Sequence, residues 1–285
     1  MSQASGGFES VPIEEVRRFW NARPCNLRHS PEPVGTRAYF EQVAERKYRV
    51  EPHIPGFAAF ERWKGKRVLE VGCGIGTDTM RFAQAGAEVT AVDLSEASLN
   101  LTRQRAEVFG VRDRVRTVHA NAEQLDEVLE VEPYDLIYSF GVIHHTPRPD
   151  VALATLRRFA GPETQIKLMV YYRYAWKVLA IVLGKGYGRF WQLDDLVARS
   201  SEAQSGCPVT YTYTRRTAEA WLERCGFRST GMVVDHIFPY RISDYREYRY
   251  VMSWYFRVLP RPVFRMLERR MGWHLCIDAV PAEKG

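Results

Sequence analysis

A run of alternating glycines that ends an apolar strand constrains this chain more than any other feature. Residues 68–78 read Val-Leu-Glu-Val-Gly-Cys-Gly-Ile-Gly-Thr-Asp, with Glu70 in the strand and Gly72, Gly74 and Gly76 after it. A loop without Cβ atoms lets a ligand lie directly against the backbone. The helix expected to follow points its free N–H groups at the same place. The segment therefore predicts a site for a nucleotide-like cofactor.

The spacing of the glycines and of the next acid narrows the kind of nucleotide. A dinucleotide fold has Gly-x-Gly-x-x-Gly, whereas this chain has Gly-x-Gly-x-Gly, and it lacks the lysine of a phosphate-binding P-loop. The next expected strand, residues 88–93, ends in Asp93. A carboxylate only accepts hydrogen bonds, so both hydroxyls of a ribose can donate to it. The pattern favours a ribose-containing cofactor that is held without a phosphate loop.

These residues resemble the first motifs of the class I S-adenosylmethionine-dependent methyltransferases, in their small-molecule, methyltransferase type 11-like branch. The resemblance covers residues 63 to about 172. It implies that Glu70 and the glycines hold the methionine and ribose portions of S-adenosylmethionine. Asp93, followed by Leu94, matches the ribose acid. The expected product is S-adenosylhomocysteine, and no metal is implied.

Two further segments of the sequence match motifs of this family. The expected strand 115–120 leads into Asn121 and Ala122, where the family reads the adenine edge; Asn121 replaces the usual acid but still offers an acceptor. The expected strand 135–139 ends in Ser139, a further candidate for the cofactor site, beside the place of the transferring methyl. DNA amino-methyltransferases carry Asn/Asp-Pro-Pro-Tyr there and this chain does not, so we expect no DNA substrate.

Strands and helices alternate through the central part of the chain, which predicts a parallel sheet with helices on both faces. The family resemblance implies an α/β, Rossmann-like sheet of seven mostly parallel strands, with residues 228–234 and 274–280 as late strands. The chain is expected to be one methyltransferase domain over residues 1–285. Its expected parts are an N-terminal helical lid (1–62), the cofactor-binding core (63–172), an insertion (173–212) and a C-terminal part (213–285) with an aromatic and basic cap (235–273).

Histidines follow the fourth expected strand and are candidates for a general base. His144 and His145 lie where one imidazole can face the substrate, and histidine titrates near neutral pH. His144 is favoured because it is nearer the strand end. The alternative is that one ring bonds a backbone carbonyl in the loop.

Candidate substrate residues lie outside the motifs. Tyr39 in the lid is a candidate for closing the site, and one of the adjacent tyrosines after the fifth strand should face inward, with Tyr172 as our choice. In the cap, His236, Tyr240 and Arg241 are expected nearest the active site. Packing within the protein is the alternative for each of them.

The cap interleaves tyrosines with arginines, which on a helix would give one aromatic and one cationic face. A lid over the substrate is the favoured interpretation. A homodimer contact is the second, because tyrosine, tryptophan and arginine are enriched at interfaces. Contact with RNA or a membrane surface is the third.

The amino-acid composition does not identify the class of substrate or partner. The net charge is +6, without a lysine-rich tract, and the five cysteines are scattered without metal-ligand spacing. Together with an N-terminus that does not look like a signal peptide, this favours the cytoplasm. We expect a methyltransferase that acts on O or N of a small metabolite or natural-product intermediate. The alternatives are a tRNA or lipid methyltransferase and a catalytically silent, cofactor-binding regulatory subunit.

Overall fold

A sheet of seven strands runs through the computed structural model, which describes residues 7–184, 187–188, 192–200 and 207–282. The order in space is β3-β2-β1-β4-β5-β7-β6, with β7 antiparallel to both neighbours and the other pairs parallel. This confirms the predicted Rossmann-like, mostly parallel sheet. The strands are β1 (Arg67–Val71), β2 (Glu88–Asp93), β3 (Val115–His119), β4 (Tyr134–Phe140), β5 (Ala160–Tyr171), β6 (Phe227–Asp235) and β7 (His274–Pro281).

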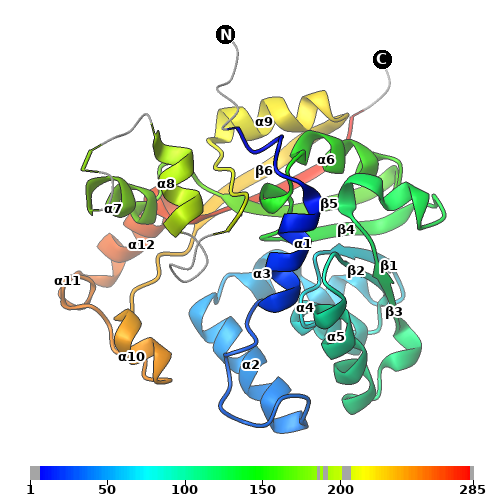
Figure 1. Ribbon diagram of the computed structural model, residues 1–285, viewed down its shortest axis with the longest axis horizontal. Coiled ribbons are helices and arrows are strands. Elements are labelled where there is room, and N and C mark those ends of the chain that lie inside the picture. The colour runs from blue at the N-terminus through cyan, green and yellow to red at the C-terminus, as the bar shows by residue number, and fades with distance from the viewer. Residues whose placement is uncertain (1–6, 185–186, 189–191, 201–206, 283–285) are drawn as a thin grey trace.

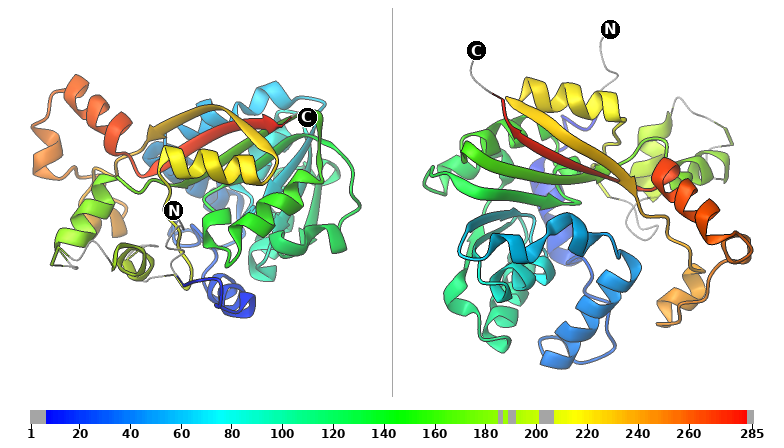
Figure 2. Two further views of the ribbon diagram at one scale, coloured as in Figure 1. Left: turned by 90° about the horizontal axis from the view of Figure 1, so that it is seen from above. Right: turned by 180° about the vertical axis from the view of Figure 1, so that it is seen from behind.

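Alternation along the strands produces a core on each face of the sheet. In β1, Val68 packs on one side and Leu69 on the other, because successive strand side chains point in opposite directions. The first face is covered by α3 (Ile54–Ala58), α4 (Thr77–Gln84) and α5 (Glu96–Val108), and the second by α6 (Pro149–Arg157) and α9 (Arg215–Arg224), as Figures 1 and 2 show. Short 3-10 turns complete the core: η1 (Phe60–Trp63), η2 (Arg112–Arg114), η3 (Ala122–Glu127) and η4 (Ile143–His145).

The remaining helices belong to the segments before, within and after the core. They are α1 (Ile13–Ala22) and α2 (Arg37–Val50) in the lid, α7 (Trp176–Gly184) and α8 (Leu193–Ser200) in the insertion, and α10 (Ile242–Arg246), α11 (Trp254–Arg257) and α12 (Arg261–Met271) in the cap. Figures 1 and 2 show the cap helices projecting away from the sheet. Among the described residues, no helix has both the length and the apolar composition that a bilayer span requires.

The cap is not the long two-faced helix that its tyrosine and arginine spacing suggested. Within residues 235–250, where tyrosines and arginines are interleaved, only 242–246 are helical, as α10. The tyrosines instead surround a cation from the lid: the Arg46 guanidinium lies 3.8 Å from the centroid of the Tyr245 ring and 4.6 Å from that of Tyr248. Arg46 also donates to the Tyr245 carbonyl and is only 4% exposed. The arginine and tyrosine pattern thus encodes a contact between lid and cap.

A substitution at Gly72 would show how tightly the glycine loop is packed. Its φ is +81° and an added Cβ would lie 2.2 Å from Cγ2 of Val142. We expect Gly72→Ala to lower the free energy of unfolding by about 1–2 kcal/mol from the left-handed backbone and by a further ~1–3 kcal/mol from overpacking. Urea denaturation measures both.

Gly110 is the matched control. Its φ is +68°, but an added Cβ would meet nothing within 4 Å. Gly110→Ala should therefore show only the backbone cost. Equal losses in the two variants would contradict the predicted clash with Val142.

Candidate active site

A cavity of about 880 Å³ opens where the parallel strands end. Its walls come from the loops after β1, β2, β3 and β4, and from the lid, the insertion and the cap. The residues predicted for the cofactor that line it are Gly72, Gly74, Asp93, Leu94, Asn121 and Ala122. The structure therefore brings the three cofactor motifs to one end of a single cavity.

The loop after β1 takes the shape that its glycines permit. Gly72, Gly74 and Gly76 have φ values of +81°, +55° and +74°, which favour glycine. An added Cβ on Gly74 would meet no protein atom within 4 Å, so this backbone is open to a ligand. An added Cβ on Gly76, in contrast, would lie 2.9 Å from the side chain of Thr102 in α5. Gly76 therefore allows α5 to pack closely against the loop.

Asp93 fixes this loop and faces the cavity. One carboxylate oxygen accepts the Gly74 N–H at 2.7 Å, and the other accepts the Ser95 N–H at 2.8 Å. Burial raises the pKa of Asp93, against the N–H donors of Ser95 and Gly74, which favour its charged form. The remaining lone pairs can accept from a ligand diol.

Asn121 has a local role besides lining the cavity. Its side-chain oxygen accepts the Glu123 N–H at 3.1 Å and caps η3. This bond fixes the turn that holds Ala122 on the cavity wall.

Three residues predicted for the cofactor do not line the cavity: Gly76, which packs against α5, and Glu70 and Ser139. Glu70 lies beneath the loop, where its carboxylate accepts from the Thr79 hydroxyl at 2.5 Å. Burial, with the nearby Asp78 carboxylate, raises the pKa of Glu70 to about 8. Ser139 is 1% exposed and donates to the Val71 carbonyl at 2.9 Å, which joins β4 to β1. Both residues support the loop from below, so the prediction that Ser139 contacts the cofactor needs correction.

The structure places the two predicted histidines differently with respect to the cavity. His144, the favoured base, is fully buried away from the cavity, with its ring 4.0 Å from that of Tyr171. Burial, reinforced by His145, lowers the pKa of His144 well below its usual value. His145 lines the cavity, and its Nδ1 lies 2.7 Å from the Val209 carbonyl. If Nδ1–H donates there, Nε2 is the basic nitrogen of the neutral ring.

Some of the predicted substrate residues line the cavity and others do not. His236, Tyr240 and Arg241 line the cavity. Tyr39 is wrong as a substrate residue, because it is 0% exposed and donates to the Leu27 carbonyl at 2.8 Å inside the lid. Tyr172 is also wrong: its partly buried side chain packs against the core on the other side of the sheet, and the neighbouring Tyr171 faces the cavity.

The substrate half, meaning the part of the cavity wall away from the cofactor motifs, is rich in aromatic groups. Most of its residues were not predicted from the sequence. Trp20 of α1, Tyr171 at the end of β5 and Trp273 before β7 line it, and the Tyr171 and Trp273 rings stack at 4.0 Å. Lys47 brings a cation to the wall and pairs with the buried Asp78 at 2.8 Å. Only Trp20 had a local signal, since it follows Val16 by one helical turn and both line the cavity.

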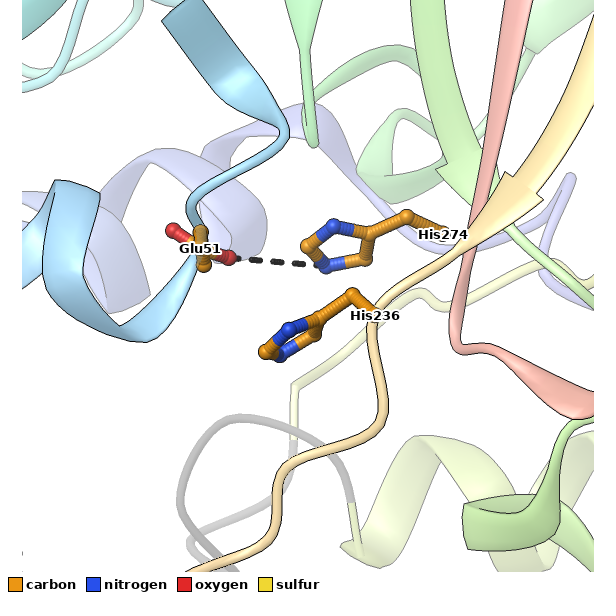
Figure 3. A group of neighbouring side chains, drawn as sticks. All are labelled: Glu51, His236 and His274. Atoms are coloured by element: carbon orange, nitrogen blue, oxygen red, sulfur yellow. Dashed lines mark ion pairs between the residues drawn. The ribbon is translucent and has the colours of Figure 1, made fainter. Parts of the chain in front are cut away.

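A cluster of imidazoles with one carboxylate was also missed. Glu51, His236 and His274 line the cavity and place ligand atoms within 4.8 Å of one another (Figure 3). Burial, with the neighbouring His53 and Lys177, lowers the pKa of His236 to about 3. Burial, reinforced by His236 and His53, also lowers the pKa of His274 well below its usual value. Both imidazoles are therefore neutral in the folded protein.

The outer surface of the cap carries exposed apolar groups. Trp254 is 70% exposed and Val258 is 67% exposed, and Arg257 lies between them in sequence. The homodimer contact, and the less favoured contact with RNA or a membrane, stay predictions.

Glu70 predicts a specific pH dependence of stability. Its pKa is about 8 in the folded chain against 4.5 for the free group, so folding favours the protonated form. The stabilisation from Glu70 is then complete below about pH 4.5 and is lost as the pH rises through about 8. The free energy of unfolding of the wild type should fall relative to Glu70→Gln over this window, by at most ~1.4 kcal/mol per pH unit. Urea denaturation from pH 5 to 9 measures the difference, and Glu88→Gln, at an exposed position, should keep the wild-type slope.

Known proteins with similar sequences include methyltransferases and an uncharacterized protein. Residues 68–163 match the family model described as a methyltransferase domain. An uncharacterized protein of Synechococcus is 31% identical over 165 residues, which are 54% of this chain and 38% of that protein. A ubiquinone biosynthesis O-methyltransferase of Aromatoleum aromaticum is 32% identical over 123 residues, 43% of this chain and 51% of that enzyme. The chain thus spans about half, or less, of the length of these relatives.

Solved structures share the fold over nearly the whole chain. The magnesium protoporphyrin IX methyltransferase of Synechocystis PCC 6803, solved with bound SAH, has a TM-score of 0.58 at 17% identity and covers 95% of this chain and 100% of its own. The geranyl diphosphate C-methyltransferase of Streptomyces coelicolor has a TM-score of 0.60 at 15% identity and covers 98% and 100%. The domain match shows that residues 68–163 form a methyltransferase domain, and the solved structures show that the chain shares the fold of S-adenosylmethionine-dependent methyltransferases.

Proposed function

We propose that this chain transfers a methyl group from S-adenosylmethionine to an oxygen or nitrogen of a small molecule, releasing S-adenosylhomocysteine. The observation that carries the proposal is the Asp93 carboxylate, which holds the Gly74 and Ser95 N–H groups at the edge of a ligand-sized cavity. In this assignment Asp93 accepts the ribose hydroxyls, and Asn121 and Ala122 contact the adenine. The open backbone at Gly74 accommodates the methionine portion.

The substrate half favours a flat, largely apolar acceptor. Trp20, Tyr171 and Trp273 supply aromatic faces, and Tyr240 and Arg241 supply polar groups from the cap. Relatives named for O-methylation in ubiquinone biosynthesis point to a hydroxyl acceptor in preference to an amine. The five scattered cysteines make the cytoplasm the proposed location.

Methyl transfer is an in-line displacement in which the acceptor attacks the methyl carbon as the bond to sulfur breaks. The site must hold the acceptor about 3 Å from the methyl and remove its proton. His145 is the proposed base, because it lines the cavity and the Val209 carbonyl orients its ring. His144 then has a packing role between His145 and Tyr171.

Titration calorimetry tests the cofactor assignment. Wild-type protein should bind S-adenosylmethionine and should not bind NADH. Asp93→Asn and Asp93→Ala should weaken binding by about 1–3 kcal/mol, because ribose hydroxyls are left without their acceptor. Asp113→Ala, at an exposed acid outside the cavity, is the control and should bind like the wild type.

Absence of binding by the wild type would refute the proposal. Mass spectrometry of an acceptor panel that includes phenols and amines then identifies the product class. Binding without turnover on any acceptor would favour the silent regulatory subunit. RNA binding that falls steeply with salt would favour the tRNA enzyme.

The histidine pair allows a matched test of the base. His145→Asn should lower kcat for a hydroxyl acceptor about 10²- to 10⁴-fold while the affinity for S-adenosylmethionine stays unchanged. His144→Phe keeps an aromatic ring at the buried position and should retain most of the activity. A larger loss of kcat in His144→Phe than in His145→Asn would contradict the assignment.

A further inference from the structure

Three potential metal ligands from distant parts of the chain meet at the wall of the cavity. Glu51 follows α2, His236 follows β6, and His274 is the first residue of β7. Their ligand atoms all lie within 4.8 Å of one another, and Figure 3 shows the Glu51 carboxylate and both imidazoles converging. All three residues line the cavity.

The spacing is close to that of a metal site. Nitrogen and oxygen ligands lie about 2.0–2.2 Å from a zinc ion, so two ligand atoms of a tetrahedral site are ~3.4 Å apart. His274 Nε2 and Glu51 Oε1 are already 3.5 Å apart. The His236 nitrogen lies within 4.8 Å of both other ligand atoms, so a shift on the order of an ångström would bring it to the spacing of a tetrahedral site.

A second layer of groups orients His274. Its Nδ1 lies 3.0 Å from Nε2 of His53, and Nδ1 of His53 lies 3.9 Å from Oδ1 of Asp235. Histidines that bind metals characteristically engage their other ring nitrogen in such a contact, which fixes the ring and its tautomer. The chain of contacts leaves Nε2 of His274 directed at Glu51.

His236 is held in a backbone conformation that few side chains adopt. Its φ is +69°, which costs about 1–2 kcal/mol for a residue other than glycine. Its N–H donates to the Asp235 carboxylate at 2.7 Å, and its carbonyl accepts the Trp273 N–H at 2.7 Å. These bonds hold the imidazole on the cavity wall, where it is 7% exposed.

We propose that Glu51, His236 and His274 bind one divalent transition-metal ion whose open positions face the acceptor. Two imidazoles and one carboxylate favour zinc, iron or cobalt over magnesium and calcium, which prefer oxygen ligands alone. No motif in the sequence indicates this site, because Glu51 lies far along the chain from both histidines.

The position of the site suggests its role, and this step rests on the proposed function. The His274 ring lies 5.4 Å from that of Phe140, the last residue of β4, where the transferring methyl is expected. A metal-bound acceptor hydroxyl is more acidic than a free one. With a metal ion held there, the proton of the acceptor hydroxyl would pass to His145, the proposed base, its oxygen would form the bond to the methyl carbon, and the carbon–sulfur bond would break to give S-adenosylhomocysteine. The inferred substrate class is therefore an acceptor with a metal-binding hydroxyl, such as a catechol or a hydroxy-ketone.

Metal binding can be measured without the cofactor or an acceptor. Protein treated with EDTA and dialysed should bind one Zn²⁺ by calorimetry, and one Co²⁺ with visible absorption bands. Glu51→Gln and His236→Ala should each weaken zinc binding at least tenfold. His53→Phe, which removes the contact to Nδ1 of His274, should weaken it about 10- to 100-fold.

Controls separate this site from other ligands. Glu45→Gln, at an exposed acid of α2, and His119→Ala, at a surface histidine, should bind zinc like the wild type. Cys25→Ser tests the exposed cysteine that also lines the cavity. Far-ultraviolet circular dichroism and S-adenosylmethionine calorimetry on each variant report whether the fold and the cofactor site are intact.

Lack of stoichiometric binding by the wild type would overturn the inference, as would unchanged affinity in both Glu51→Gln and His236→Ala, or loss of binding in Cys25→Ser alone. Each of these results leaves S-adenosylmethionine binding as a separate measurement, so failure of the metal site is distinguishable from failure of the methyltransferase proposal.

Discussion

The active site depends on one carboxylate that ties two loops together. Asp93 ends β2, yet its oxygens accept N–H groups from the loop after β1 and from the start of α5. The Val92 carbonyl adds to this, accepting from Gly72 at 2.7 Å and from Cys73 at 3.0 Å. Because the loop is held from the next strand, its left-handed backbone is a fixed surface before any ligand arrives. The cost of burying the carboxylate is offset by N–H groups that the loop itself supplies.

The support continues below the loop, where buried polar groups attach the lid to the core. Asp78, 2% exposed, accepts from Lys47 at 2.8 Å, from Tyr48 at 2.9 Å and from Tyr138 at 2.9 Å. These partners come from α2 and β4, so one carboxylate joins the lid, the helix after the glycine loop and the sheet. Removal of Lys47 would leave the buried Asp78 charge without its counter-ion, which costs far more than the ion pair contributes to stability. The lid is therefore anchored as part of the site.

The sequence predicted the cofactor half of the site because its signals are local. A glycine loop or a strand-ending acid is read from a few consecutive residues, and parallel topology then brings such residues to one edge of the sheet. Prediction of the substrate half depends instead on which of two adjacent residues points its side chain into the cavity. Tyr171 and Tyr172, like His144 and His145, differ by one position, and local strand or turn geometry decides between them. Tyr39 failed for another reason, since its hydroxyl is used by the Leu27 carbonyl within the lid.

The substrate half is built where the lid meets the cap. Glu51 directly follows the lid helix α2, whereas His236 lies at the start of the cap and His274 follows its end. Nearby on α2, Arg46 is enclosed by the Tyr245 and Tyr248 rings and donates to the Tyr245 carbonyl, which holds the lid against the cap. A guanidinium buried against aromatic faces is stable only with the partners in place. The cap stretch thus has two uses: Tyr240 and Arg241 line the cavity, and Tyr245 and Tyr248 hold Arg46 of the lid and so fix the wall against which an acceptor binds.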